Sequence, residues 1–400
     1  MISNKLHGRI RGIFPFPLLP LFLLVGIFYV NFICRVAIAP LLPVIKLDLG
    51  LGLTKASSLF LLMASGYCIG LFVSGFVTAR LSHHRTILLS AGMMGIAMLA
   101  LSQTASLGAI YLSLMIAGLA AGLYLPSGIA IITDLVSKEH WGKALAIHEL
   151  APNLGFVTAP LLVEAFLRFC SWRGVLALMG SCSILTGLIF LFYGRGGDFK
   201  GEAPRLRAMQ NLLGEPVFWM MTALFSAAIG ASFGAYSMMP LFLVSERGMS
   251  RELANTLLSL ARGIGFLTLF LSGWITDRAG HKQVIVLFVS MTGVLVLLIG
   301  VIHHPRIVPW LVILQASSAV CTFPAGFAMM SSHLPPSMRN LGVSLVIMIG
   351  YFLGGGLCPL GMGYIAELFS FSWSFVLLGL FCLSMVPLLL KIRPFQGDNL

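Results

Sequence analysis

The chain has 400 residues, of which 58% are hydrophobic and only 10% are charged, whereas soluble domains carry about 25% charged residues. This composition excludes an ordinary soluble protein, a disordered chain and a coiled coil. The formal net charge of +12 does not indicate a nucleic-acid partner, because the basic residues lie in short loops between apolar runs.

A transmembrane helix needs about 20 mostly apolar residues, and the sequence contains twelve such runs. We expect all-α spans and not a β-barrel, because the runs are too long and too continuously apolar for alternating strands. The predicted spans are 17–44, 57–79, 86–104, 107–133, 144–168, 173–193, 216–243, 254–276, 283–302, 307–331, 340–366 and 372–390.

Twelve spans place both termini on one side, and the basic residues indicate which side. The loops on the terminal side hold sixteen Lys and Arg residues and the opposite loops hold seven, so the positive-inside rule predicts cytoplasmic termini in the inner membrane. The seven predicted outer residues are Lys46, Lys55, Arg168, Arg173, Arg247, Arg251 and Arg306. Arg9 and Arg11 before the first run resemble a secretory signal, but that run is too long and contains Arg35.

The second half of the chain repeats the first at an offset of 198 residues. The segment from Gly75 to Arg80 corresponds to that from Gly273 to Arg278, and the Pro126 region corresponds to the Pro324 region. We therefore predict two pseudo-symmetric six-helix bundles, residues 1–193 and 216–400, joined by a cytoplasmic linker, residues 194–215. Parallel repeats with a substrate path between them are typical of secondary transporters.

The segment after span 8, which contains Gly273, Asp277, Arg278 and Gly280, resembles the loop signature of the major facilitator superfamily, Gly-x-x-x-Asp-Arg-x-Gly-x-basic. The resemblance implies that this loop steadies one conformation of the transporter through a charge relay. The N-terminal counterpart keeps Gly75 and Arg80 but has Ala79 in place of Asp and Ser82 in place of Gly.

Two arginines lie inside predicted spans, Arg35 in span 1 and Arg262 in span 8. Each is about nine residues, or roughly 14 Å, from the predicted outer end of its helix, and a charge at this depth costs about 2.5 to 3.5 kcal/mol on insertion scales. One arginine from each half predicts a clamp for a carboxylate, sulfonate or phosphate ester. A charge-compensating pair is the alternative explanation for either arginine.

The superfamily resemblance refines the substrate class. Arg35 followed by Pro43 is similar to the span-1 arginine of organophosphate–phosphate antiporters, although Ser232 stands near the position of their second arginine. Arg262 is similar to the mid-span-8 arginine of monocarboxylate, oxalate and nitrate carriers. Both resemblances imply an anion.

Glu149 is the acid placed well inside a span, span 5. In the fold that the resemblance implies, span 5 is a neighbour of span 8, which carries Arg262. Glu149 is therefore expected to approach Arg262. It is predicted either to carry a coupling proton or to form a permanent ion pair. The adjacent His148 is expected to be a packing or loop-facing residue.

Four polar residues of spans 1, 4, 7 and 10 are predicted to line the path and orient the ligand: Asn31, Tyr124, Tyr236 and Gln315. An interhelical hydrogen bond is the alternative for each. Gly354-Gly355-Gly356 and Gly263 with Gly265 are expected to be close-packing or bending points.

These observations predict a non-enzymatic, monomeric secondary transporter that moves a small organic anion across the bilayer together with a proton. The seven cysteines lack paired spacing, and no metal, cofactor or nucleic acid is expected. One alternative is a drug–proton antiporter, but the span-5 motif of such antiporters is reduced here to Gly155 and Pro160. The other is a membrane sensor or enzyme, but the short loops leave no room for a separate signalling domain.

Overall fold

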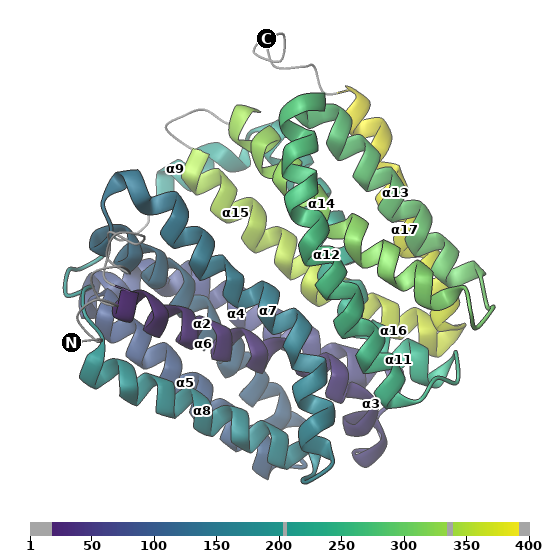
Figure 1. Cartoon of the computed structure of the whole chain (residues 1–400), viewed down its shortest axis with the longest axis horizontal. Coiled ribbons are helices and arrows are strands. Elements are labelled where there is room, and N and C mark those ends of the chain that lie inside the picture. Colours follow the sequence, from purple (N-terminus) through teal and green to yellow (C-terminus); the bar gives the residue numbers. More distant parts are fainter. Residues whose placement is uncertain (1–17, 203–205, 334–338, 392–400) are drawn as a thin grey trace, which may run out of the picture. The chain divides into compact units, whose positions relative to one another are not determined.

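The computed structural model describes residues 18–202, 206–333 and 339–391, and in these ranges the chain is helical and forms no strand (Figure 1). Its helices are α2 (Leu18–Val36), α3 (Ile38–Asp48), α4 (Leu53–Leu81), α5 (His83–Gln103), α6 (Leu107–Leu135), η1 (Lys138–His140), α7 (Trp141–Leu167), α8 (Trp172–Tyr193), α9 (Leu206–Leu213), α10 (Pro216–Ile229), η2 (Gly230–Gly234), α11 (Ala235–Ser245), α12 (Arg251–Ala279), α13 (His281–Val301), α14 (Val308–His333), α15 (Arg339–Tyr351), η3 (Phe352–Leu357), α16 (Cys358–Leu368) and α17 (Phe371–Lys391).

Twelve helical segments among the described residues are long and apolar enough to cross a membrane. Helices α2 and α3 form one of them, α10, η2 and α11 form another, and α15, η3 and α16 a third. The predicted all-α fold with twelve spans is confirmed, and the predicted boundaries differ from these by a few residues. Arg9 and Arg11 lie outside the described residues.

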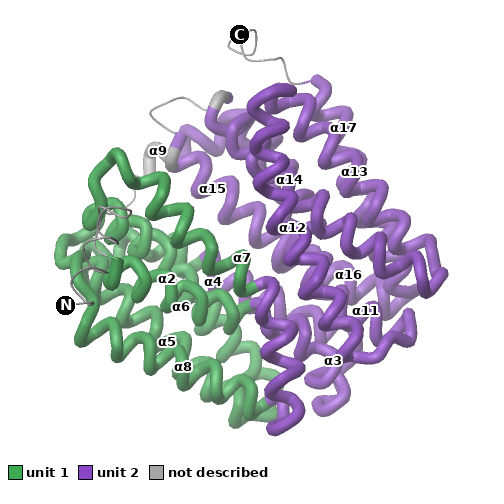
Figure 2. Tube along the Cα trace, viewed as in Figure 1, with its two compact units in different colours: residues 1–35, 69–155, 173–204 green, residues 36–68, 156–172, 205–400 purple. Residues whose placement is uncertain are grey.

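The described chain divides into two compact units, coloured separately in Figure 2. Of the described residues, unit 1 comprises 18–35, 69–155 and 173–202, and unit 2 comprises 36–68, 156–172, 206–333 and 339–391. Helices α2, α4, α7 and α8 contribute residues to both units. The units therefore do not follow the sequence repeat, and the division into bundles 1–193 and 216–400 stays a prediction.

In unit 1, α5 packs along α6 and approaches α8 closely. The Ser90 hydroxyl donates to the Ala120 carbonyl oxygen at 2.6 Å. A Cβ atom at Gly95 would lie 2.8 Å from the Gly180 carbonyl oxygen. Small and hydroxyl-bearing residues at such contacts hold helices together where apolar burial gives no preference for protein over lipid.

In unit 2, α13 and α17 run side by side (Figure 1). Two other spans of this unit contain the π-helical segments η2 and η3, which lie against each other. A Cβ atom at Gly354 in η3 would lie 2.6 Å from the Gly230 nitrogen in η2. The close packing expected at Gly354 is therefore observed, whereas a Cβ atom at Gly263 would have no neighbour within 4 Å.

Span 1 is interrupted between α2 and α3. Pro40 has no N–H to donate to the Val36 carbonyl, which removes one bond of the helical ladder. The break leaves Arg35 in the last turn of α2, where a cation interacts favourably with the helix dipole.

The loop after span 2 and the loop after span 8 share an unusual backbone conformation. Ser82 has φ 110° and ψ 161°, and Gly280, at the offset of 198, has φ 83° and ψ 145°. This region of φ and ψ is populated almost entirely by glycine. The predicted repeat thus extends to backbone geometry at a position where the first half lacks the glycine.

The structure describes most of the predicted linker. Its first residues lie on unit 1, where the His84 amide donates to the Gly197 carbonyl at 2.9 Å and the Gly201 amide donates to the Thr78 carbonyl at 3.2 Å. Residues 203–205 lie outside the described residues. The helix α9 that follows was not predicted from the sequence.

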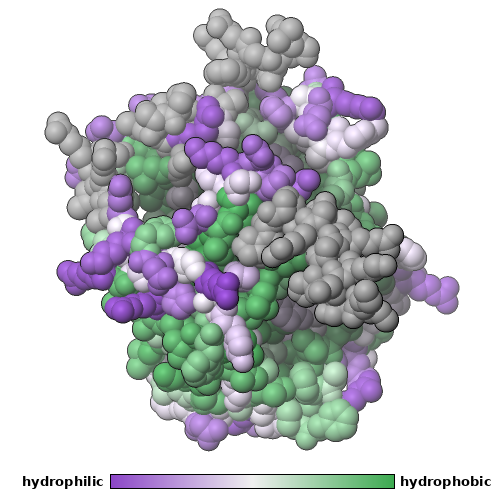
Figure 3. All heavy atoms as spheres, turned by 60° about the vertical axis from the view of Figure 1, so that its left-hand side comes forward, coloured by the Kyte–Doolittle hydropathy of each residue, from purple (hydrophilic) through white to green (hydrophobic). Residues whose placement is uncertain are grey.

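Large apolar side chains are exposed along the spans, as expected of a protein surrounded by lipid. Examples are Phe192, Leu267, Phe270, Trp310 and Ile96. The face in Figure 3 shows hydrophobic residues covering much of the surface in view.

Candidate functional site: the Arg262 centre

Arg262 lies in the middle of α12 and is only 5% exposed. Its Nη1 donates to the Ser232 hydroxyl at 3.1 Å, and its Nη2 donates to the Ser232 carbonyl oxygen. Ser232 belongs to η2, and a π-helical turn frees backbone carbonyls from the regular i to i−4 ladder. The neighbouring Ala231 carbonyl accepts from Gln315 Nε2 at 2.7 Å. The irregular segment η2 thus supplies the oxygens that hold both Arg262 and Gln315.

Two aromatic rings lie against the Arg262 guanidinium. Its Cζ atom is 4.3 Å from the centroid of the Phe156 ring and 4.9 Å from that of the Tyr236 ring. Such contacts stabilise a desolvated cation by about 2 kcal/mol. The Tyr236 hydroxyl is buried and makes no hydrogen bond to a described residue. An unsatisfied buried hydroxyl is costly, so this atom is a candidate for contact with a ligand.

Within the described part of unit 2, no carboxylate pairs with Arg262. A guanidinium carries five N–H donors, and Ser232 accepts from two of them. The others make no hydrogen bond to a described residue of this unit. The Arg262 centre, defined as Arg262, Ser232, Phe156, Tyr236 and Gln315, therefore presents a buried positive charge with spare donors.

The predicted residues of span 1 belong to unit 1. Arg35 is buried, and its Cζ atom lies 5.5 Å from the centroid of the Phe32 ring. Asn31 is one turn earlier on α2, and neither atom of its buried amide bonds to a described residue. Because Arg35 and Arg262 belong to different units, their pairing in a clamp stays a prediction.

Tyr124 and Gln315 make interhelical hydrogen bonds, the alternative that the sequence leaves open for them. The Tyr124 hydroxyl donates to the Leu24 carbonyl oxygen at 2.6 Å, and Gln315 is held by η2 as described above. Their role in orienting a ligand stays a prediction.

Glu149 lies on the unit 1 part of α7, with a side chain that is 54% exposed. Its Oε1 atom is 3.3 Å from Nδ1 of the buried His148. The expected approach of Glu149 to Arg262 joins residues of different units and stays a prediction.

A polar stripe on α12, which the sequence analysis did not single out, faces the unit 2 part of α7. The Glu164 carboxylate accepts from Arg251 Nε at 2.9 Å and from Arg251 Nη2 at 3.1 Å. It also accepts from Asn255 Nδ2 at 2.5 Å, and the Ser259 hydroxyl donates to the Val157 carbonyl at 2.6 Å.

The spacing of the stripe gives the signal that would have revealed it. Residues 251, 255, 259 and 262 follow at intervals of four, four and three, which places them on one face of a helix. Arg262 is therefore the innermost member of a row that ends at the Glu164–Arg251 ion pair.

The loop signature after span 8 is only partly explained by the described residues. Arg278 stacks on Trp274, with its Cζ atom 3.9 Å from the ring centroid. In the described ranges Asp277 makes no salt bridge. The roles inferred for Gly75, Arg80, Gly273, Asp277, Arg278 and Gly280 stay predictions.

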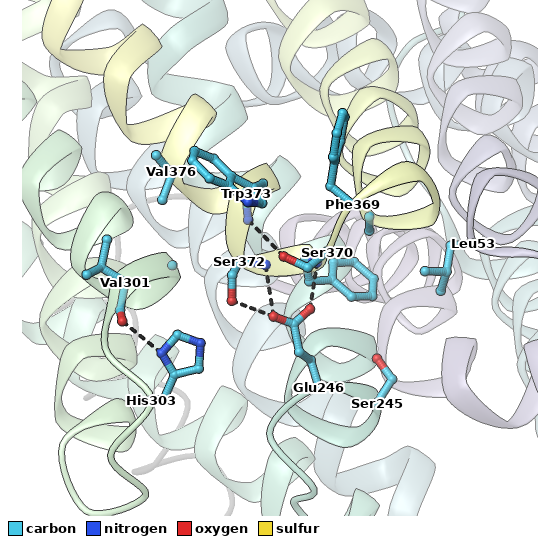
Figure 4. A pocket seen from close by; sticks show the side chains of 13 residues that line it. Leu53, Ser245, Glu246, Val301, His303, Phe369, Ser370, Ser372, Trp373 and Val376 are labelled. Carbon is cyan, nitrogen blue, oxygen red and sulfur yellow. Dashed lines mark hydrogen bonds between the residues drawn. The ribbon is translucent and has the colours of Figure 1, made fainter.

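A cavity of about 760 Å³ opens near the N-terminus of α17 in unit 2 (Figure 4). Glu246 projects toward that terminus and accepts from the Phe371 amide at 2.6 Å and the Ser372 amide at 3.1 Å. Glu246 also lies 3.6 Å from Arg247, outside the spans, where burial lowers the pKa of the guanidinium. The carboxylate is thus engaged in capping a helix.

The described residues contain no group of three His, Cys, Asp or Glu that could hold a metal ion. The seven cysteines are free thiols.

Comparison with known proteins gives the family. The sequence pattern described as Major Facilitator Superfamily matches residues 21–320 and 263–399. The chain is 25% identical over 251 residues to the uncharacterized MFS-type transporter YfkF of Bacillus subtilis, covering 60% of this chain and 61% of that protein. It is also 25% identical over 146 residues to the glucose transporter GlcP of Staphylococcus epidermidis, covering 36% of this chain and 33% of that protein. The chain thus spans less than two thirds of the length of these relatives.

The fold agrees with that family. A crystal structure of a bacterial homologue of the human lysosomal transporter Spinster, in an inward-facing and occupied conformation, superposes with a TM-score of 0.77 at 18% identity, covering 93% of this chain and 96% of that one. The chain therefore belongs to the Major Facilitator Superfamily of secondary transporters, multi-pass membrane carriers that are not enzymes.

Proposed function

We propose that this transporter moves a small organic anion and that Arg262 binds the anionic group. The observation that carries the proposal is the buried Arg262 guanidinium, which has spare N–H donors and no carboxylate partner in the described part of unit 2. A charge in the membrane interior requires a partner or a hydrated cavity. A planar, permanently charged group suits a carboxylate, sulfonate or phosphate ester because it donates two parallel hydrogen bonds.

The surroundings of Arg262 favour an anion that also carries an apolar portion. The rings of Phe156 and Tyr236 lie against the guanidinium, and the Phe233 ring is 5.9 Å from that of Phe156. The Tyr236 hydroxyl offers a donor to a second polar atom of the ligand. Arg35 and Asn31 on α2 are proposed as the contribution of the first half of the chain.

Proton symport is the coupling that we propose, with Glu149 as the proton carrier. Moving one uncompensated charge across the membrane costs about 2.3 kcal/mol per 100 mV of opposing potential. A proton that accompanies a monovalent anion removes this electrical work. Glu149 is half-exposed, lies on a spanning helix and contacts the buried His148, which is the arrangement that supports this assignment.

Uptake into proteoliposomes tests the proposal, with labelled benzoate, methanesulfonate and glycerol phosphate as anions and glucose as a neutral probe. We expect saturable uptake of at least one anion, a loss of at least 100-fold in kcat/KM in Arg262→Ala, and partial activity in Arg262→Lys. Two charge-assisted hydrogen bonds of about 1.5 to 3 kcal/mol each account for that loss.

The control is Arg306→Ala, which removes an exposed positive charge from a loop and should leave uptake unchanged. Arg35→Ala should also abolish saturable uptake if each half of the chain supplies one cation. Uptake of glucose alone, or normal anion uptake in both Arg35→Ala and Arg262→Ala, would overturn the proposal. A proton gradient should raise anion accumulation, and Glu149→Gln should remove that rise while sparing anion exchange.

A further inference from the structure

Three helices of unit 1 meet at His148. Its ring is fully buried and lies 4.4 Å from the Phe28 ring of α2, at an interplanar angle of 8°. The Tyr124 hydroxyl of α6 is 3.2 Å from His148 Nε2, and the Glu149 carboxylate of α7 is 3.3 Å from His148 Nδ1. Stacking on Phe28 fixes the plane of the ring, so each ring nitrogen keeps its own partner.

The hydrogen bond of Tyr124 determines which ring nitrogen carries a proton. Its hydroxyl has one hydrogen, which it donates to the Leu24 carbonyl oxygen at 2.6 Å. A carbonyl oxygen only accepts, so the hydroxyl oxygen must accept from His148 Nε2. The neutral imidazole therefore carries its hydrogen on Nε2, and its Nδ1 is an acceptor.

This tautomer leaves two acceptors facing each other. Nδ1 of the neutral ring presents a lone pair, and so does the ionised Glu149 carboxylate 3.3 Å away. A hydrogen bond between them needs one further proton, carried either by the imidazolium Nδ1 or by the carboxylic acid. We propose that His148 and Glu149 together bind a single proton, and that this shared site is the proton site of the transporter.

Each of the three helices packed around the proton site, which consists of His148 and Glu149, contributes groups that face it. From α2 these are the Phe28 ring and the Leu24 carbonyl, from α6 the Tyr124 hydroxyl, and on α7 the Glu149 carboxylate. Of the two groups, the His148 ring is fully buried and Glu149 is half-exposed, so a proton reaches the ring through the carboxylate.

Loss of the shared proton has a structural consequence. Either the Glu149 carboxylate turns away from Nδ1, or the ring hydrogen moves to Nδ1 and the Tyr124 hydroxyl must turn from Leu24 to Nε2. The second change leaves a buried Tyr124 hydroxyl bond on α2 unmade, which loosens the contact between α6 and α2. Asn31 and Arg35 also lie on α2. Protonation of the site therefore changes how firmly the helix that carries these two residues is held against α6. The link between protonation of this site and the ligand-binding residues of α2 rests on the proposed function, whereas the shared proton itself does not.

Infrared titration of the purified protein tests the shared proton without any substrate. As the pH is raised we expect wild-type protein to lose one proton from an imidazolium or carboxylic-acid group, and this signal should be absent from both Glu149→Gln and His148→Gln. The glutamine side chain introduced by His148→Gln keeps an N–H for the Tyr124 hydroxyl but cannot bind the proton. The matched control Glu139→Gln, in the exposed segment η1, should keep the signal.

Tyr124→Phe gives a second readout, because it removes the acceptor that holds the hydrogen on Nε2. Nitrogen NMR of labelled histidine should then show a shift of the neutral ring toward the Nδ1–H tautomer. A wild-type spectrum with neutral His148 and ionised Glu149 throughout the pH range would overturn the proposal, as would an unchanged titration in Glu149→Gln.

Transport measurements separate this proposal from the proposed function. If the titration signal is present but no anion is transported, the proton site stands and the substrate assignment fails. If anions are transported and a proton gradient drives their accumulation equally in wild type, Glu149→Gln and His148→Gln, the site is not the proton site of transport and the inference fails.

Discussion

The ion pair between Glu164 and Arg251 offers a direct test of how this transporter opens. In unit 2 it joins the end of α7 to the start of α12, at the predicted outer side. The Glu164 carboxylate accepts two hydrogen bonds from Arg251 and one from Asn255. Alternating access requires that contacts between the two sequence halves at one side of the membrane break in each cycle. We therefore predict that Glu164→Gln shifts the equilibrium toward a state that is open at this side.

The magnitude follows from the bonds that the substitution weakens. A hydrogen bond to a charged group contributes about 1.5 to 3 kcal/mol. Glu164 is 11% exposed but Arg251 is 34% exposed, so solvent reduces the contribution of this pair. The amide oxygen of glutamine still accepts one bond. A net loss of about 1.5 to 2 kcal/mol corresponds to a change of about 10- to 30-fold in the population of the open state.

Thiol labelling of a Ser259→Cys variant in detergent measures this population. Ser259 lies on α12 and is buried against α7, where its hydroxyl donates to the Val157 carbonyl. A thiol at this position therefore reacts when the two helices separate. The exposed Cys170 is replaced by serine in this background. We expect Glu164→Gln to raise the labelling rate about 10- to 30-fold. Glu252→Gln, an equal change of charge on an exposed residue in the first turn of α12, is the control. An unchanged labelling rate in a folded Glu164→Gln protein would refute the reasoning.

Four further substitutions test stability, and the last of them also tests contact with the substrate. Ser82→Gly should stabilise the protein by about 1 kcal/mol and raise its melting temperature, because glycine adopts the φ of 110° without strain; a lower melting temperature would contradict this account. Gly354→Ala should destabilise by about 1 to 3 kcal/mol, because the new Cβ atom would meet backbone atoms of α10 and η2. Gly263→Ala, with open space at its Cβ position, should have little effect or stabilise in the same thermal assay. Tyr236→Phe should leave the melting temperature unchanged or higher, since the lost hydroxyl has no described partner, while raising KM for the anion; an unchanged KM would exclude contact with the substrate.

The twelve spans and the family could be predicted from the sequence because both depend on local information. A run of apolar residues determines that a segment crosses the membrane whatever its neighbours are, since lipid leaves the backbone no other way to satisfy its hydrogen bonds. The residues around Gly273 and Asp277 form a contiguous signature, and the offset of 198 residues is visible by aligning the chain with itself. The buried positions of Arg35 and Arg262 also followed from their depth in apolar runs.

The partners of these residues depended on the tertiary structure. Glu164 lies near the end of its span, and nothing local distinguishes it from an ordinary loop acid until α12 brings Arg251 and Asn255 to it. Ser232 accepts from Arg262 because η2 departs from α-helical geometry, a departure that arises where two spans pack through glycines.

The same distinction holds at His148. The sequence indicated a packing or loop-facing residue, whereas the structure places its two ring nitrogens beside Tyr124 and Glu149, and the hydrogen bond from Tyr124 to Leu24 assigns its tautomer. Hydropathy determines which residues enter the membrane, but hydrogen bonds between helices far apart in the chain determine which of their polar atoms are satisfied and which remain for a substrate or a proton.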